Sequence, residues 1–230
     1  MKFESTDIWG FQHAIRGMRN PMNSWQKSDS WFYELDKVGN LGPKDISLAT
    51  NLIASGTEHR KFLRQIFVSV DITAPLYWWK EFDTYKVGTV ANSTSTMHKL
   101  LSYPITLDCF ETGDATDLPV DEHSSVGYFV EESLIGFLEK LRLKAVELYD
   151  GKQDELAKAY WKELIRWLPE SWLQTRTVTM NYENIRSMYY QRQNHKLTEW
   201  REDFCNWVKS LPYSKEFLIE TKGEDNGKQN

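Results

Sequence analysis

The chain has 230 residues, a formal net charge of −5 and a pI near 5.6. Its 40% hydrophobic and 27% charged residues are typical of a globular domain, and the acidic balance gives no reason to expect a nucleic-acid or membrane partner. The two cysteines and five histidines lack metal-ligand spacing. Because no signal-peptide core or bilayer-length apolar run is visible, we expect a cytoplasmic protein without a metal site.

The first half of the chain predicts helices around one strand. Apolar residues at helical spacing predict a helix over 43–55, ended by a Ser-Gly pair. The segment Phe62–Ile72 is rich in β-branched and aromatic residues and predicts a strand, followed by a helix over about Ala74–Tyr85. An acidic loop with Pro and Gly is expected within 102–125.

The second half is mainly helical. Apolar residues that recur from Val126 to Leu148 predict one long amphipathic helix. The composition of the tail predicts disorder over 221–230. No repeat or linker is visible, so we expect one α+β domain over 1–220. Further helices are predicted at Asp154–Leu168, Tyr182–Gln193 and Leu197–Leu211, and a strand at Thr175–Met180.

The stretch Asp71–Leu100 is the most informative part of the sequence. An aromatic run is followed by KVGTVANSTST, in which hydroxyls and backbone N–H groups lie beside the cation Lys86. Such groups suit a phosphate, and the aromatic rings could form a flat wall for a ring system. The alternative is a buried aromatic helix followed by a polar loop.

Arg192 is an unusual residue on its predicted helix. It lies on the same stripe as Ile185, Met188 and Tyr189, and a buried guanidinium needs a partner. A carboxylate of the protein or a phosphate or carbonyl of a ligand would serve. Asn181, at the start of this helix, is interpreted first as an N-cap.

Two other clusters have both a functional and a structural interpretation. Arg16 and Arg19 stand in a segment broken by Gly and Pro, which predicts either a basic loop that closes on a polyanion or a solvated turn. His195 and Glu199 are spaced as a local helical pair.

Six segments, in order, resemble the flavin-dependent thymidylate synthases, the ThyX family. No one of them is specific alone, but together they cover most of the chain. They are AIR at Ala14–Arg16, LIASGTEHRKF with Glu58 and His59, APLYWWKEFDTYKVGTVANSTS, RWLP at Arg166–Pro169, VTMNYENIRSMYYQR ending at Arg192, and HKLTEWRE.

The resemblance implies an α+β fold with helices packed on a central, mostly antiparallel sheet. It implies an enzyme, a homotetramer, that methylates dUMP reductively to dTMP with FAD, methylenetetrahydrofolate and NADPH. Two alternatives remain, a flavin- and folate-dependent hydroxymethylase acting on a pyrimidine nucleotide, and a nucleotide-binding protein of this fold without catalysis. The departures from the family signature indicate a divergent branch, typical of a phage or mobile element.

The resemblance also implies roles for individual residues. Thr84, Tyr85 and Lys86 stand at the Arg-His-Arg positions of the family signature, and Met97 replaces its final arginine. Arg192 matches the residue that grips the pyrimidine. By the same resemblance, Ser95 acts with Arg192 in catalysis, and Ser95, Glu81 and Arg166 contact the nucleotide, while Lys86, Tyr85, Thr89, His59, Asn181 and Arg16 contact the flavin cofactor.

Overall fold

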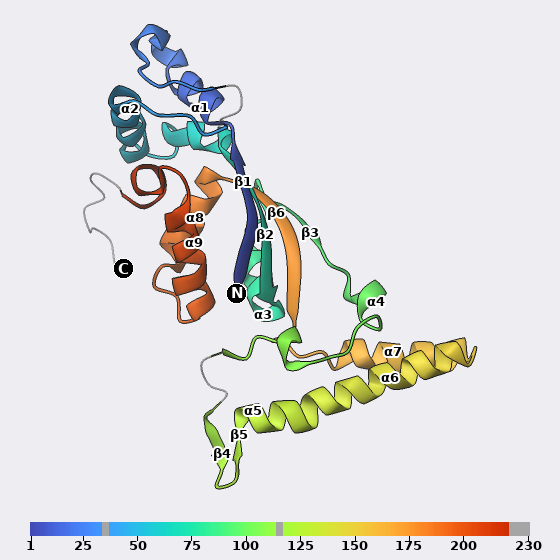
Figure 1. Ribbon diagram of the computed structural model, residues 1–230. Coiled ribbons are helices and arrows are strands. Elements are labelled where there is room, and N and C mark those ends of the chain that lie inside the picture. The colour runs from blue at the N-terminus through green and yellow to red at the C-terminus, as the bar shows by residue number, and fades with distance from the viewer. Residues whose placement is uncertain (34–36, 114–116, 221–230) are drawn as a thin grey trace. The chain divides into compact units, whose positions relative to one another are not determined.

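The computed structural model describes residues 1–33, 37–113 and 117–220, and its main sheet has four strands in the order β1-β2-β6-β3 (Figure 1). These strands are β1 (Lys2–Trp9), β2 (Phe67–Pro75), β3 (Val90–Ser93) and β6 (Leu173–Asn181). Side-chain hydrogen bonds pair Thr73 with Thr175 and Ser69 with Thr179, so β2 and β6 run antiparallel. The predicted α+β class with an antiparallel sheet is confirmed.

Strand β2 alternates in burial as a half-buried strand should. Val68, Val70 and Ile72 are buried, whereas the residues between them are more exposed. The predicted strand began five residues too early, because Arg60–Gln65 forms a 3-10 helix, η3. Phe62 and Leu63 are adjacent and both buried, which a helical turn allows and an alternating strand does not.

The chain divides into two compact units. One contains Met1, Thr73–Phe82 and Ser93–Arg176, and the other contains Lys2–Ile72, Asp83–Asn92 and the chain from Thr177 onward. The expected single-domain organisation therefore stays a prediction.

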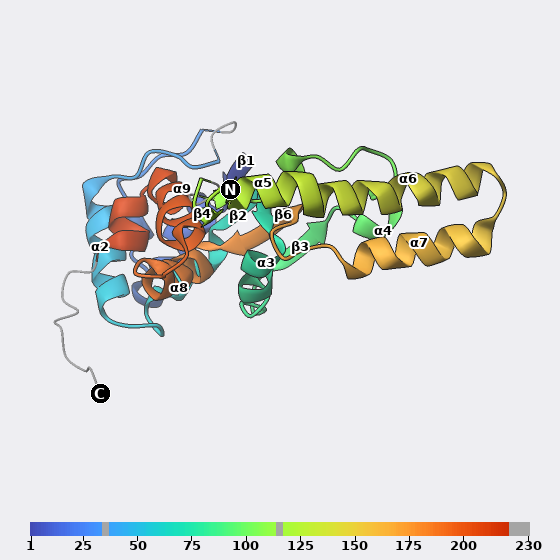
Figure 2. The same ribbon diagram turned by 90° about the horizontal axis from the view of Figure 1, so that it is seen from below.

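The first unit is dominated by a helical hairpin. Helices α6 (Gly136–Asp150) and α7 (Asp154–Arg166) lie side by side (Figure 2). Because α5 (Val126–Phe129) and the π-helical turn Val130–Ile135 continue into α6, the long helix predicted from Val126 is confirmed. The other elements of this unit are α3 (Leu76–Phe82), α4 (Thr96–Lys99), η4 (Leu107–Cys109), β4 (Pro119–Asp121) and β5 (Ser124–Ser125).

The second unit has a core rich in aromatic rings. Phe11 packs edge-on against Tyr182 and stacks with Phe217, which joins the N-terminal helix to the C-terminal segment. Helices α8 and α9 lie side by side (Figure 1). The helices and turns of this unit are α1 (Phe11–Met18), η1 (Asn20–Met22), η2 (Trp25–Lys27), α2 (Pro43–Ala54), η3, α8 (Tyr182–Arg192), η7 (Glu199–Phe204), α9 (Cys205–Ser210) and η8 (Lys215–Ile219).

Some elements agree with the sequence predictions and some do not. Helices α2, α7 and α8 and strand β6 lie where they were expected, and α3 is shorter than predicted at both ends. Strands β1 and β3 and helix α1 were not predicted. The predicted disordered tail lies outside the described residues. Within the described ranges, no helix is long and apolar enough to cross a membrane.

Candidate functional site

The guanidinium of Arg192 is held by aromatic side chains at the end of α8. Its Nε donates a hydrogen bond to the Tyr85 hydroxyl at 2.8 Å. The guanidinium carbon lies 5.4 Å from the centre of the Tyr85 ring and 4.7 Å from the centre of the Trp200 ring. The two rings and the hydroxyl stabilise the charge on this mainly apolar face.

The segment Asp83–Asn92 is attached along the length of α8. The Asn184 Nδ2 donates to the Val87 carbonyl at 2.7 Å near the start of the helix, while Tyr85 contacts Arg192 at its end. Gly88 has a φ of +75°, and a Cβ there would lie 2.8 Å from Asn184 Oδ1. The positive φ and the close approach to the Asn184 side chain both favour glycine at this position.

The first turn of α8 carries a cap and a buried acceptor without a donor. Asn181 Oδ1 accepts from the Asn184 backbone N–H at 3.0 Å, which confirms the N-cap interpretation. Asn184 Oδ1 is buried and makes no hydrogen bond within the described residues. A buried acceptor of this kind often marks a place where a ligand or ordered water donates.

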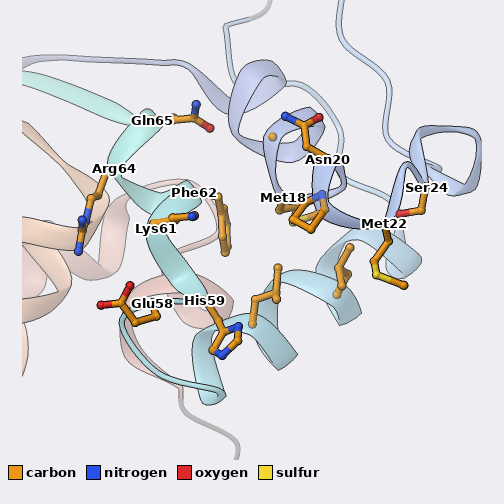
Figure 3. Close-up of a pocket in the computed structure, with 14 residues that line it drawn as sticks. Met18, Asn20, Met22, Ser24, Glu58, His59, Lys61, Phe62, Arg64 and Gln65 are labelled. Carbon is orange, nitrogen blue, oxygen red and sulfur yellow. The ribbon is translucent and has the colours of Figure 1, made fainter.

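A cavity of about 890 Å³ lies between η3 and the segment that follows α1 (Figure 3). Figure 3 shows Lys61 and Phe62 directed from η3 toward Met18, and Glu58 and Arg64 line the cavity as well. His59 also lines the cavity. Within the described residues, Lys61 forms no ion pair with a carboxylate, so its charge is available to an anionic ligand.

Helix α8 and the cavity-lining helix η3 are joined directly. Arg60 Nε donates to the Glu183 carboxylate at 3.0 Å, and the Tyr182 backbone N–H donates to the Ile66 carbonyl at 2.9 Å. With a rise of about 1.5 Å per residue, roughly 14 Å of helix separates Glu183 from Arg192. Arg192, at one end of α8, and the cavity beside η3 are therefore linked through hydrogen bonds between α8 and the η3 segment.

The arginines near the N-terminus do not form a basic loop around one ligand. Arg19 is buried, and its Nε donates to Asp45 Oδ1 at 2.6 Å, so the interpretation of Arg19 as a polyanion contact or solvated turn is wrong. Arg16 is exposed, lies 5.5 Å from the centre of the Trp25 ring, and lines a separate cavity of about 170 Å³.

The remaining predicted residues lie in several places. Ser95 caps α4 by accepting from the His98 N–H, Glu81 lies on α3, and Arg166 pairs with Glu163 on α7; these three belong to the first unit. Lys86 is exposed in the Asp83–Asn92 segment, and the Thr89 hydroxyl there donates to the Tyr85 carbonyl.

The aromatic run after β2 does not form a wall for a ligand. Trp78 and Trp79 are 0% and 1% exposed and pack edge-on against each other, and Phe82 is buried with them. The alternative of a buried aromatic helix is therefore the correct one.

Sequence reasoning missed Lys61 as a candidate contact. The only signal was the basic run HRKFLR, and the strand predicted from Phe62 began directly after Lys61. Because the run forms a 3-10 helix instead, Lys61 and Phe62 can both be directed toward the cavity.

Comparisons with known proteins show the fold. No protein-family profile matches the sequence, and no curated protein matches it. A crystal structure of ThyX from Helicobacter pylori with FAD and dUMP is 18% identical, with a TM-score of 0.61 over 96% of this chain and 98% of that one. A second structure of that enzyme with FAD and dUMP is 17% identical with a TM-score of 0.64, again over 96% and 98% of the two chains.

A third similar structure is the UMP/dUMP methylase PolB from Streptomyces cacaoi, bound to 5-Br dUMP. It is 16% identical, with a TM-score of 0.58 over 94% of each chain. At these identities the likeness shows the fold, and the chain has the ThyX fold, as the sequence predicted.

Proposed function

We propose that this protein is a flavin-dependent enzyme that methylates a pyrimidine nucleotide, with dUMP as substrate and dTMP as product. Methylenetetrahydrofolate would supply the carbon, and NADPH would reduce the flavin. The observation that carries the proposal is Arg192, a cation fixed by Tyr85 and Trp200 in a chain with the ThyX fold. Its position in the sequence matches the pyrimidine-binding arginine that the resemblance implies.

Arg192 would both bind the nucleotide and polarise it. A guanidinium presents donors in a rigid fork and keeps its charge, so it can bind a uracil carbonyl and stabilise negative charge that develops there. That stabilisation makes C5 of the pyrimidine a better nucleophile. Such chemistry needs no protein nucleophile, in agreement with the absence of a recognisable nucleophile–base motif in the sequence.

The large cavity suits an anionic ligand that carries a ring system. Its volume of about 890 Å³ lies in the range of small-molecule sites, and its lining combines the cations Lys61 and Arg64 and one carboxylate, Glu58, with the apolar side chains of Phe62 and Met18. Lys61 and His59 would hold the phosphates of FAD. When bound and reduced, the flavin supplies a hydride.

The other residues implied by the resemblance stay part of the proposal. Ser95, Glu81 and Arg166 are proposed nucleotide contacts, and Asn181, Lys86 and Thr89 are proposed to lie near the flavin. Arg16 lines a different cavity from Lys61 and is the weakest of the proposed cofactor contacts. We also propose a cytoplasmic location.

The function is tested by adding FAD to the purified protein, with and without dUMP, and following flavin fluorescence. Saturable binding that dUMP strengthens is expected, and incubation with methylenetetrahydrofolate and NADPH should then yield dTMP. Mass spectrometry of the product distinguishes a methyl from a hydroxymethyl group. Unchanged fluorescence at millimolar FAD, with dUMP present, would favour a nucleotide-binding protein without catalysis.

A further inference from the structure

We infer that Tyr85 is a positioning residue that orients Arg192 toward the pyrimidine nucleotide. The identity of the ligand rests on the proposed function, but the contacts between Tyr85 and Arg192 are present in the structure without any ligand. It also changes the role given to Tyr85, which the family resemblance placed at the flavin. In this role Tyr85 would act on the nucleotide only through Arg192.

A directed chain of hydrogen bonds fixes the Tyr85 hydroxyl. Gln191 Nε2 donates to the Ser187 Oγ at 3.0 Å, which turns the Gln191 carbonyl oxygen toward Tyr85. That oxygen accepts the Tyr85 hydroxyl proton at 3.0 Å. Because the proton is used in this bond, a lone pair of the hydroxyl oxygen faces Arg192 Nε, which donates to it at 2.8 Å.

The backbone around Tyr85 is fixed as well. The Thr89 hydroxyl donates to the Tyr85 carbonyl, and the Val87 carbonyl accepts from Asn184 Nδ2 at 2.7 Å. Gly88 permits the close approach of the loop to α8. The hydroxyl of Tyr85 is therefore held at a defined place along the helix before any ligand binds.

This arrangement fixes the plane of the guanidinium. Nε is anchored by Tyr85, and the Tyr85 and Trp200 rings lie 5.4 Å and 4.7 Å from the guanidinium carbon. An arginine side chain otherwise samples many rotamers, and fixing it in advance reduces the entropy lost on binding. A guanidinium fixed in this way is the group that would recognise a carbonyl or phosphate of the nucleotide.

The first test needs no ligand. In the full-length protein, NMR should detect a slowly exchanging Nε proton of Arg192, and Tyr85→Phe should make its exchange about tenfold faster because one hydrogen bond is lost. Tyr190→Phe is the matched control, because Tyr190 lies on α8 two residues before Arg192 and its hydroxyl donates to the Ile219 carbonyl instead. Equal exchange in Tyr85→Phe and the wild type would overturn the inference.

The second test is a double-mutant cycle for dUMP affinity, followed by NMR titration so that millimolar dissociation constants are measurable. Tyr85→Phe should weaken dUMP binding about tenfold in the wild-type background and have no effect in the Arg192→Ala background. An equal loss in both backgrounds would mean that Tyr85 contacts the ligand itself and would overturn the inference.

The two proposals fail in different ways. If wild-type protein binds no dUMP, the proposed function fails, and the exchange of the Arg192 Nε proton still decides the role of Tyr85. If dUMP binds and Tyr85→Phe binds it as tightly as the wild type does, the positioning role fails while the proposed function stands.

Discussion

Arg192 and Arg19 show how two buried or half-buried arginines acquire different roles. Arg19 forms an ion pair with the buried carboxylate of Asp45, whereas Arg192 is held by a hydroxyl and two rings. An arginine paired with a buried carboxylate stabilises the fold. Arg192 instead contacts Tyr85, which is far from it in sequence, and Trp200, which lies on η7.

Arg192→Ala should weaken dUMP binding by about 2–5 kcal/mol, because it removes a charged contact from a partly desolvated place. Isothermal titration calorimetry at constant salt measures the loss. Arg176→Ala is the control, since Arg176 also lies over a tryptophan ring, 4.2 Å from the centre of Trp79, in the first unit. Unchanged dUMP affinity in Arg192→Ala would remove this residue from the nucleotide site.

Asp45→Asn should destabilise the protein and change its response to acid. Asp45 accepts from Arg19 and from the hydroxyls of Ser28 and Ser30, so its loss should cost about 2–4 kcal/mol of unfolding free energy at pH 7. Burial alone would raise the pKa of Asp45, but the hydrogen bonds from Ser28, Ser30 and Arg19 outweigh it and lower the pKa.

Because the folded-state pKa of Asp45 is lowered, its contribution is complete above about pH 4 and is lost as the pH falls through the folded pKa. Urea unfolding should therefore show wild type and Asp45→Asn converging in acid. Asp7→Asn, which affects an exposed pair with Lys37, should change stability little. A difference that does not shrink as the pH falls through the folded-state pKa of Asp45 would contradict this account.

For single residues, the sequence predicted what kind of partner a side chain needs better than it predicted which residue supplies that partner. It identified Arg192 as a cation in need of a partner and Asn181 as a cap. It could not show that Tyr85 is that partner, because residues 107 apart in sequence meet only through the fold. The burial of Arg19 depends in the same way on Asp45, which is 26 residues distant.

Among the elements, the segment Asp83–Asn92 and helix α8 form the most specific pair. Gly88→Ala should lower the free energy of unfolding by about 1–2 kcal/mol and weaken dUMP binding, because a Cβ would displace Asn184 and loosen the loop that carries Tyr85. Gly113→Ala provides the control, since Gly113 also has a positive φ but no atom within 4 Å of an added Cβ. Equal effects of the two changes on dUMP binding would rule out a specific contact at Gly88.

Helix η3 leads to a prediction for the flavin. Lys61→Ala should weaken FAD binding by about 1.5–3 kcal/mol, and added salt should reduce the difference between variant and wild type. Fluorescence titration measures both effects. Lys140→Ala, on the exposed side of α6, removes a similar charge in the first unit and should leave FAD affinity unchanged. If the two variants bind FAD equally well, Lys61 has no part in the site.

Elements with strong periodicity were predictable, and elements defined by long-range pairing were not. The helices from Val126 and from Asp154 follow directly from their apolar spacing. Strand β3 has four exposed residues, VANS, and becomes a strand only because it pairs within the sheet. Strand β1 is also mostly exposed, so local pattern gave no signal for it.

On the scale of the whole molecule, exposed apolar side chains on the helical hairpin predict self-association. Phe137 and Leu143 are 44% and 52% exposed on α6, and Trp167 is 59% exposed just after α7. Trp78 and Trp79 are buried within the chain, so they cannot form the contact between subunits. We therefore expect a dimer or tetramer that uses the hairpin.

Light scattering at micromolar concentration should give a mass that is a multiple of 27.1 kDa. The double variant Phe137→Glu and Leu143→Glu should shift the mass to that of the monomer, because charges would be buried in the contact. Tyr103→Glu, at a site 70% exposed in a loop, should not change the mass. A monomeric wild type with dUMP and FAD present would contradict this prediction.

The division of the chain into two units has a consequence for how the protein can be cut or rebuilt. The boundaries fall at Ile72–Thr73, Phe82–Asp83, Asn92–Ser93 and Arg176–Thr177, inside or next to β2, α3, β3 and β6. Neither unit is a continuous stretch of sequence, so a fragment such as 93–176 would lack the buried tryptophans of its own unit. Gene truncations that separate the units should yield insoluble products, whereas insertions at the exposed turn near Gly151 and Lys152 should be tolerated.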